Sequence, residues 1–116
     1  MKEKPKFTIL YTEEAMSFLQ SLDSKVQDKI AFNINKCRFY TDKELFKKLE
    51  NSEIWEFRTL YNKKAYRLFA FWDKSSKNDT VVISTHGMIK KSDKIHKSEI
   101  DRAEAIRNLY FERIQL

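Results

Sequence analysis

The spacing of apolar residues changes along the chain, and the change predicts where helices give way to strands. Residues 6–11, KFTILY, alternate between polar and apolar side chains and predict a short strand. Ala15, Phe18 and Leu22 then recur at helical spacing, and Thr12 in front of them is a suitable N-cap. The chain therefore begins with a strand followed by a helix.

A second helical stripe follows at once. Ser24 and Gln27 have the spacing of a capping box at its start. The stripe behind them keeps to one helix face and consists of Val26, Ile30, Ile34 and Cys37. The short turn at residues 22–24 predicts an antiparallel pair of helices. The position of Cys37 favours a packed thiol, while its basic neighbours leave a reactive thiol as the alternative.

Beyond the helices the hydrophobic period shortens to that of strands. Residues 41–50, TDKELFKKLE, still have helical spacing and predict one or two further helical turns. The segments IWEFRTL, AYRLFAFW and TVVISTHGM are rich in β-branched and aromatic residues. The linkers YNKK and DKSSKND separate them, which predicts a three-stranded antiparallel meander.

A last apolar stripe predicts a C-terminal helix from Ser98 to about Arg113, with Ser98 and Asp101 as an N-cap pair. Its inward positions are Ile100, Ala103, Ile106, Tyr110 and Ile114. The order β-α-α-β-β-β-α predicts an α+β fold, with an N-terminal strand and a helical hairpin packed on an antiparallel sheet. At 116 residues, the whole chain (1–116) is expected to be one domain.

Composition excludes several classes of site. A single cysteine excludes an internal disulfide and a cysteine metal cluster, and two histidines without ligand spacing add no metal site. No apolar run approaches the roughly 20 residues of a membrane span, and the N-terminus has no signal-peptide pattern. We expect a cytoplasmic protein that needs no cofactor and has no membrane partner.

The formal net charge of +6 comes from two segments with a charge of +3 each. Between residues 54 and 72, only Glu56 opposes Arg58, Lys63, Lys64 and Arg67. Between residues 85 and 97, only Asp93 opposes Lys90, Lys91, Lys94 and Lys97. A patch formed by both segments would attract a phosphate backbone. Charge alone favours the alternative, two solvated loops that do not meet.

The pairing of the first two meander strands predicts that two arginines face each other. A two-residue or a four-residue hairpin loop around Asn62-Lys63 puts Arg58 directly opposite Arg67. Facing like charges destabilise a strand pair by up to about 1 kcal/mol. Glu56 shares this face and is expected to neutralise one arginine but not both. The alternatives are a salt-bridge network around Glu56 and a paired guanidinium clamp for phosphate.

Two aromatic residues share the face of the arginines. Phe69 and Phe71 are expected to be core beneath the final helix, and a platform for base stacking is the alternative. The opposite face of the two strands is expected to pack on the helices. It carries Trp55, Phe57, Thr59, Tyr66, Leu68, Ala70 and Trp72.

The segment THGMIKKSDKIH ends the last strand and contains the only glycine and both histidines. Gly87 predicts either a strand that bends or comes close to a ligand, or a simple bulge. His86 is interpreted as a structural histidine bonded to backbone, with a catalytic role as the alternative.

The two segments IWEFRTLYNKKAYRLFAFWDK and ISTHGMIKKSDKIHKSEIDRAEAIRNLY together resemble the phage-derived, HigB-type branch of the RelE/ParE toxin superfamily. The similarity rests on the strand order, the E-x-R strand, the Y-R of the next strand, the H-G-x-x-K-K after the last strand and the A-x-x-I-R of the final helix. It covers roughly residues 54–111 and implies a RelE-like fold.

The resemblance implies the toxin of a type II toxin–antitoxin system, a ribosome-dependent and metal-independent endoribonuclease that cuts mRNA. Its partners would be a cognate antitoxin, the ribosome and mRNA. Arg58, Arg67, Lys90 and Lys91 would contact the scissile phosphate region. His96 is the nearest candidate acid or base, and Tyr110 is the alternative. The other lysines of the basic segments would bind RNA, namely Lys63, Lys64, Lys94 and Lys97.

Two other functions fit the same residues. A ParE-type relative would inhibit DNA gyrase and would need no RNA-cutting residues. A non-enzymatic basic phage protein would bind nucleic acid in a salt-sensitive way without cleaving it.

Overall fold

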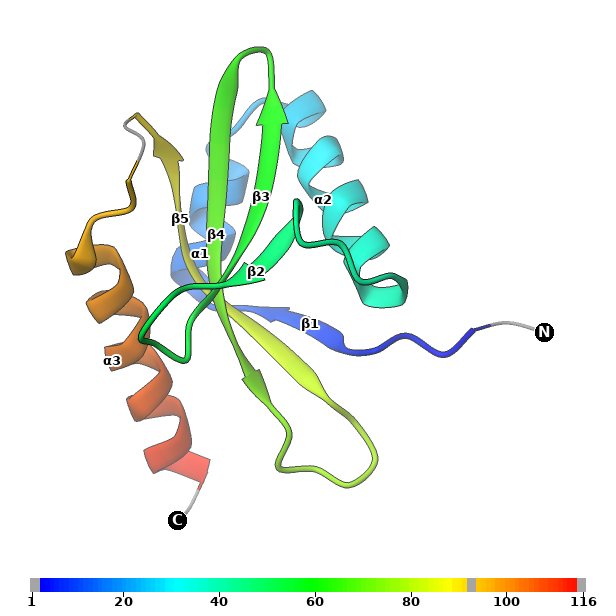
Figure 1. Cartoon of the computed structure of the whole chain (residues 1–116), viewed down its shortest axis with the longest axis vertical. Coiled ribbons are helices and arrows are strands. Elements are labelled where there is room, and N and C mark those ends of the chain that lie inside the picture. Colours follow the sequence, from blue (N-terminus) through cyan, green and yellow to red (C-terminus); the bar gives the residue numbers. More distant parts are fainter. Residues whose placement is uncertain (1–2, 92–93, 115–116) are drawn as a thin grey trace.

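A mixed sheet with the strand order β1-β5-β4-β3-β2 is the middle layer of the molecule (Figure 1). The computed structural model describes residues 3–91 and 94–114, with side chains to Arg113. Its strands are β1 (Thr8–Tyr11), β2 (Phe46–Lys48), β3 (Trp55–Tyr61), β4 (Lys64–Asp73) and β5 (Val81–Lys90). Its helices are α1 (Glu13–Gln20), α2 (Ser24–Phe39) and α3 (Lys97–Ile114). The predicted α+β class and the β3-β4-β5 meander are confirmed, and β1 joins the sheet parallel to β5.

The helices α1 and α2 pack on one face of the sheet. The stripe predicted for α2 is buried there, and the predicted inward positions of β3 and β4 lie in or against the same core. Cys37 is 4% exposed, and burial raises the pKa of its thiol to about 11. It is therefore a packed thiol, as its position in the stripe indicates.

The helix α3 packs on the other face. Phe69 and Phe71 are fully buried beneath it, against Ala103 and Ile106, so the prediction that they are core is confirmed. The side chain of Ile114, the last predicted inward position, lies outside the described residues. Apolar packing by α3 thus occupies part of the face that carries the arginines.

Two of the three predicted helix starts differ in detail. Thr12 caps α1 as predicted, because its hydroxyl oxygen accepts a hydrogen bond from the Ala15 N–H at 3.1 Å. Asp23 occupies the N-cap of α2 instead of Ser24. The helix α3 begins at Lys97, so Ser98 lies inside it and is not its cap.

Residues 46–48 form a strand, and the prediction of helical turns between residues 41 and 50 was wrong. Phe46 pairs with Phe57 of β3, and the two rings stack with centroids 4.0 Å apart. Leu45 packs in the core under α2, whereas Leu49 packs in the core under α3. One helix face cannot serve both sides of a sheet, so this segment crosses its edge in an extended form.

Gly87 allows α1 to approach β5 closely. A Cβ atom at this position would lie 2.3 Å from Cδ2 of Phe18. The register shift between β4 and β5 occurs two residues earlier, where Thr85 is the extra residue. The prediction of a bulge at Gly87 was therefore wrong, and the close neighbour of Gly87 is the phenyl ring of Phe18 in α1.

We predict that Gly87→Ala lowers the free energy of unfolding by about 1–3 kcal/mol, because the added methyl group overpacks the contact with Phe18. Chemical denaturation measures this change. The matched double variant Gly87→Ala/Phe18→Leu should recover part of the loss. A Gly87→Ala protein as stable as the wild type would contradict the packing role.

Candidate functional site

The tight turn between β3 and β4 sets the position of two arginines. Asn62 and Lys63 have φ angles of 50° and 65°, which are the positive values that a two-residue hairpin turn of type I′ requires. Tyr61 consequently pairs with Lys64, and Arg58 lies directly opposite Arg67. The predicted register is confirmed. Arg58 and Arg67 are called the arginine pair below.

One carboxylate contacts both members of the arginine pair. Glu56 Oε1 lies 3.2 Å from Arg67 Nε, and its Oε2 lies 3.8 Å from Arg58 Nε. The expectation that Glu56 would serve one arginine only was wrong, because its two oxygens are divided between them. Neither contact is an aligned hydrogen bond, so these are ion pairs with imperfect geometry.

The arginine pair is held in a poorly hydrated environment. Arg67 and Glu56 are only 5% and 3% exposed, while the Arg58 side chain is 30% exposed. Burial lowers the pKa of Arg67, Glu56 raises it and Arg58 lowers it again. Arginine remains protonated at neutral pH all the same. Two guanidinium groups and one carboxylate leave an excess positive charge, which an anion would stabilise.

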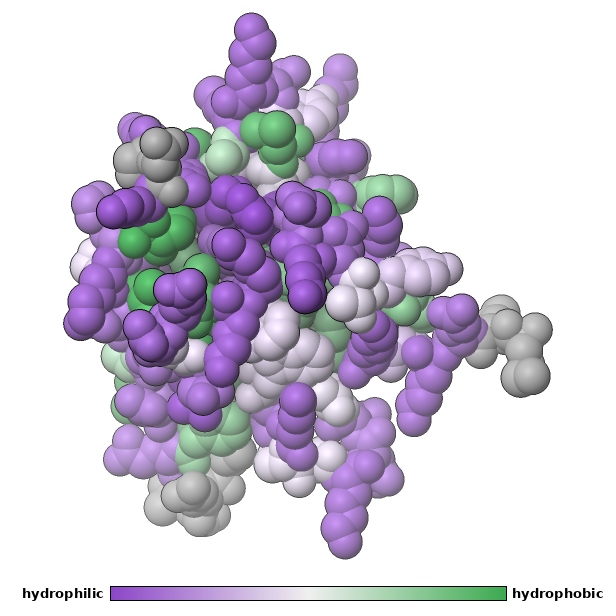
Figure 2. All heavy atoms as spheres, viewed as in Figure 1, coloured by the Kyte–Doolittle hydropathy of each residue, from purple (hydrophilic) through white to green (hydrophobic). Residues whose placement is uncertain are grey.

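A hollow of about 330 Å³ gives access to the arginine pair. It is called the arginine hollow, and its lining residues are Glu44, Leu45, Arg58, Thr59, Leu60, Ala65 and Arg67. Hydrophilic side chains predominate on the viewed face over the β3–β4 hairpin, with hydrophobic residues among them near its tip (Figure 2). The hollow therefore combines a charged floor with short apolar walls, which suits a small anionic group.

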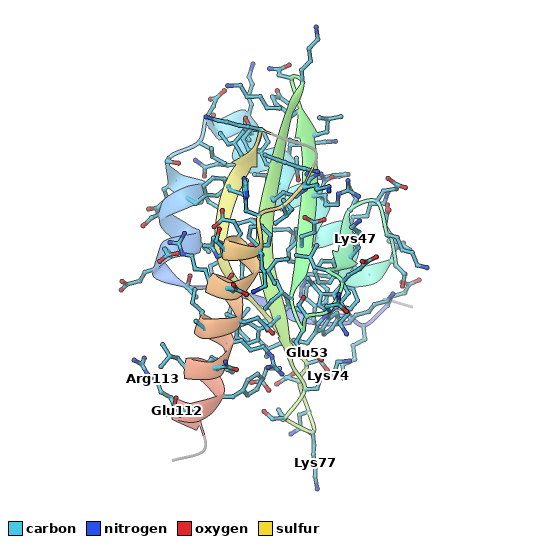
Figure 3. The ribbon with its side chains drawn as sticks, turned by 60° about the vertical axis from the view of Figure 1, so that its left-hand side comes forward. Lys47, Glu53, Lys74, Lys77, Glu112 and Arg113 are labelled. Carbon is cyan, nitrogen blue, oxygen red and sulfur yellow. The ribbon has the colours of Figure 1, made fainter. Side chains whose placement is uncertain are left out.

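Two lysines share the face of the arginine pair. Lys90 at the end of β5 pairs with Ala65, one alternation along β4 from Arg67. Lys47 of β2 pairs with Glu56 (Figure 3). Lys90 was among the predicted site residues, but Lys47 was missed because β2 was predicted to be helical. Once β2 is read as a strand, the alternation of FKK points Lys47 to this face.

The other predicted site residues lie at the periphery. Lys63 and Lys64 are exposed at the tip of the β3–β4 hairpin. Lys91, Lys94 and His96 are exposed in the segment between β5 and α3, and Lys97 forms an ion pair with Asp101. None of these described side chains lines the arginine hollow. The structure thus puts Lys90 on the same face as the arginine pair, whereas the other predicted cations lie outside the arginine hollow.

His86 is a buried structural histidine, as interpreted from the sequence. Its polar neighbours are side chains, whereas a bond to the backbone was expected. Nδ1 lies 3.1 Å from Thr85 Oγ1, and Nε2 lies 3.4 Å from Glu99 Oε1. Burial lowers the pKa of His86 and Arg102 lowers it further, whereas Glu99 and Glu14 raise it. The ring joins β5 to α3.

Tyr110 ties the other end of α3 to the sheet. Its hydroxyl donates a hydrogen bond to Asp73 Oδ2 at 2.5 Å, and its ring packs against Phe71. The bond to Asp73 raises the pKa of Tyr110 to about 12. Both contacts are structural, and the assignment of proton transfer to His96 stays a prediction.

Residues 3–91 and 94–114 contain no group of three His, Cys, Asp or Glu residues placed to hold a metal ion. No helix in this part of the chain is long and apolar enough to cross a membrane.

The sequence from residue 17 to residue 108 matches the family described as phage-derived protein Gp49-like. The chain belongs to the phage-derived Gp49-like family. The matched region runs from α1 into α3 and includes both arginines, Glu56, Lys47 and Lys90. No curated protein matches the sequence significantly.

In this Gp49-like protein, we predict that Glu56→Gln lowers the free energy of unfolding by about 3 kcal/mol, because the buried Arg67 and the partly exposed Arg58 lose their counter-charge. Added inorganic phosphate should restore part of the loss by binding between the arginines, and chemical denaturation with and without phosphate measures both effects. Glu50→Gln at an exposed position is the matched control and should be neutral. A Glu56→Gln protein of wild-type stability would contradict the buried charge contact.

We further predict a pH effect at His86. Its pKa in the folded protein lies below the ordinary value of 6.5, so the unfolded chain binds more protons between these two pKa values. The stability that depends on a neutral His86 is fully present above pH 6.5, and it is lost as the pH falls through the window between the two pKa values. Denaturation at pH 8 and pH 5.5 should show a smaller loss for His86→Gln than for the wild type. The control His96→Gln should keep the full loss, and an unchanged pH dependence in His86→Gln would refute the assignment.

Proposed function

We propose that this Gp49-like protein is the toxin of a type II toxin–antitoxin system, similar to the RelE/ParE superfamily, and that it cleaves mRNA on the ribosome without a metal ion. The observation that carries the proposal is the arginine pair, in which two guanidinium groups with one shared carboxylate lie at the floor of a solvent-open hollow. The sequence resemblance and the phage-derived family give the biological setting.

The proposed chemistry uses the RNA itself as the nucleophile. The 2′-hydroxyl oxygen attacks the adjacent phosphorus, and the bond to the 5′-oxygen of the next nucleotide breaks. Charge builds up on the phosphate oxygens, and fixed cations that face them lower the barrier without a metal. Arg58 and Arg67 serve this role in the proposal, and Lys90 and Lys91 assist from the end of β5.

Proton transfer requires a further group. An acid must protonate the leaving 5′-oxygen, and a base must accept the proton of the 2′-hydroxyl. We assign one of these roles to His96, because it lies directly before α3 on the segment that follows Lys90 and Lys91. The exposed cations Lys63, Lys64, Lys94 and Lys97 would bind the flanking RNA and the ribosome.

The test is induced expression in a sensitive bacterium, with growth and the 5′ ends of cellular mRNA measured together. We expect growth arrest with new cuts in translated mRNA. Arg58→Ala should reduce cleavage about 100-fold, as loss of a transition-state donor does elsewhere. Arg67→Lys keeps the charge but removes the bidentate fork, and it should also be impaired.

Lys25→Ala on α2 is the matched control, because it removes one exposed positive charge from the opposite side of the sheet. Circular dichroism confirms that each variant is folded. Full toxicity of a folded Arg58→Ala protein would contradict the proposed role of the arginine pair. Arrest with intact mRNA would instead support gyrase inhibition, and absence of arrest would support a non-enzymatic nucleic-acid-binding protein.

A further inference from the structure

A second basic hollow of about 310 Å³ lies where β2, β3, β4 and α3 meet. It is called the tryptophan hollow, and it is lined by Lys48, Glu53, Trp55, Trp72, Lys74 and Arg107. Three cations and one carboxylate leave a net positive charge on its walls. Figure 3 shows Glu53 and Lys74 next to each other, below Lys47 of β2.

Two indole rings give the hollow a rigid aromatic wall. The centroids of Trp55 and Trp72 are 5.7 Å apart, and the rings are nearly perpendicular at 71°. Phe46 packs against both rings, with centroid distances of 4.9 Å and 5.9 Å. Because the rings are fixed from behind and only half-buried, they present a prepared surface for a planar ligand.

The polar groups of the hollow suit a nucleotide. Lys74 Nζ lies 5.0 Å from the centre of the Trp72 ring, so a cation lies over an aromatic surface. Lys48 and Arg107 add charge from β2 and α3. The Trp72 indole N–H is buried and has no hydrogen-bond acceptor among the described residues. A ligand oxygen that reached this donor would satisfy it.

The position of the hollow relates it to the arginine pair. Trp55 and Arg58 are three residues apart on β3, so they lie about 10 Å apart along the strand and face opposite sides of the sheet. Lys47 and Lys48 are adjacent in β2, and they pair with Glu56 and Trp55 respectively. Lys47 and Lys48 therefore place one cation on each face of the sheet at its β2 edge.

We infer that the tryptophan hollow binds one nucleotide of the single-stranded RNA next to the cleavage site; this inference rests on the proposed function. The base stacks on the indole wall, and a phosphate lies among Lys48, Lys74 and Arg107. The Glu53 carboxylate accepts a hydrogen bond from a base amino group or a ribose hydroxyl. The hollow thereby aligns the strand whose phosphate the arginine pair contacts.

The protein carries its own reporter for this site, because Trp55 and Trp72 are its only tryptophans. Adenosine 5′-monophosphate should quench their fluorescence in a saturable manner, and added salt should weaken the binding. The double variant Lys74→Ala/Arg107→Ala should raise the Kd at least tenfold. The control variant Lys25→Ala, at an exposed position of α2, should leave the Kd unchanged.

A toxic protein whose tryptophans do not respond to the nucleotide, or a Lys74→Ala/Arg107→Ala protein with an unchanged Kd, would overturn the inference and leave the proposed function intact. A protein that binds the nucleotide here but neither arrests growth nor cuts mRNA would overturn the assignment to RNA at a cleavage site.

Discussion

The two-residue turn between β3 and β4 is the constraint on which the rest of the site depends. Asn62 and Lys63 adopt positive φ angles, which match the twist of the strands and fix their register. A shift of one residue would exchange the two faces of β3, so that aromatic core residues would face solvent and charged residues would face α2. The packing of the aromatic cluster and the facing of Arg58 and Arg67 therefore follow from the same turn.

The face that carries α3 is divided between apolar packing and charge. Phe69 and Phe71 lie beneath α3, and Glu56 lies opposite Phe69 at the boundary. Arg58 and Arg67 lie beyond that boundary. Among the described residues, no apolar side chain of α3 packs over them. The single negative charge of Glu56 partly offsets the two positive charges of the arginine pair and so stabilises the fold. The remaining positive charge favours the binding of an anion in the arginine hollow.

Much of this arrangement follows from local sequence rules. Periodicity predicted the helices and the meander because each of these elements buries one regular face. It failed at β2, where the spacing of Leu45, Phe46 and Leu49 matches a helix although the residues serve opposite sides of the sheet. The position of Lys47 on the arginine face and the close approach of Gly87 to Phe18 could not be predicted from neighbouring residues, because both depend on contacts between distant elements.

The register that pairs Arg58 with Arg67 was predictable, because the length of a hairpin loop fixes which residues pair. The contact of Glu56 with both arginines was not predictable. The reach of a carboxylate toward two neighbours depends on side-chain rotamers and strand twist, which the sequence does not express. The tryptophan hollow was missed because its cations are far apart in the sequence. Lys48 ends β2, Lys74 follows β4 and Arg107 lies in α3.

In the proposed function, the arginine pair promotes attack by the RNA's own 2′-hydroxyl. This role is tested most directly by mapping the ends of mRNA cut by the purified protein on programmed ribosomes. The account predicts a 2′,3′-cyclic phosphate on the upstream product, and resistance of an mRNA that carries a 2′-O-methyl group at the cut position. Cleavage of the methylated mRNA, or an upstream product that ends in a 3′-hydroxyl, would contradict it.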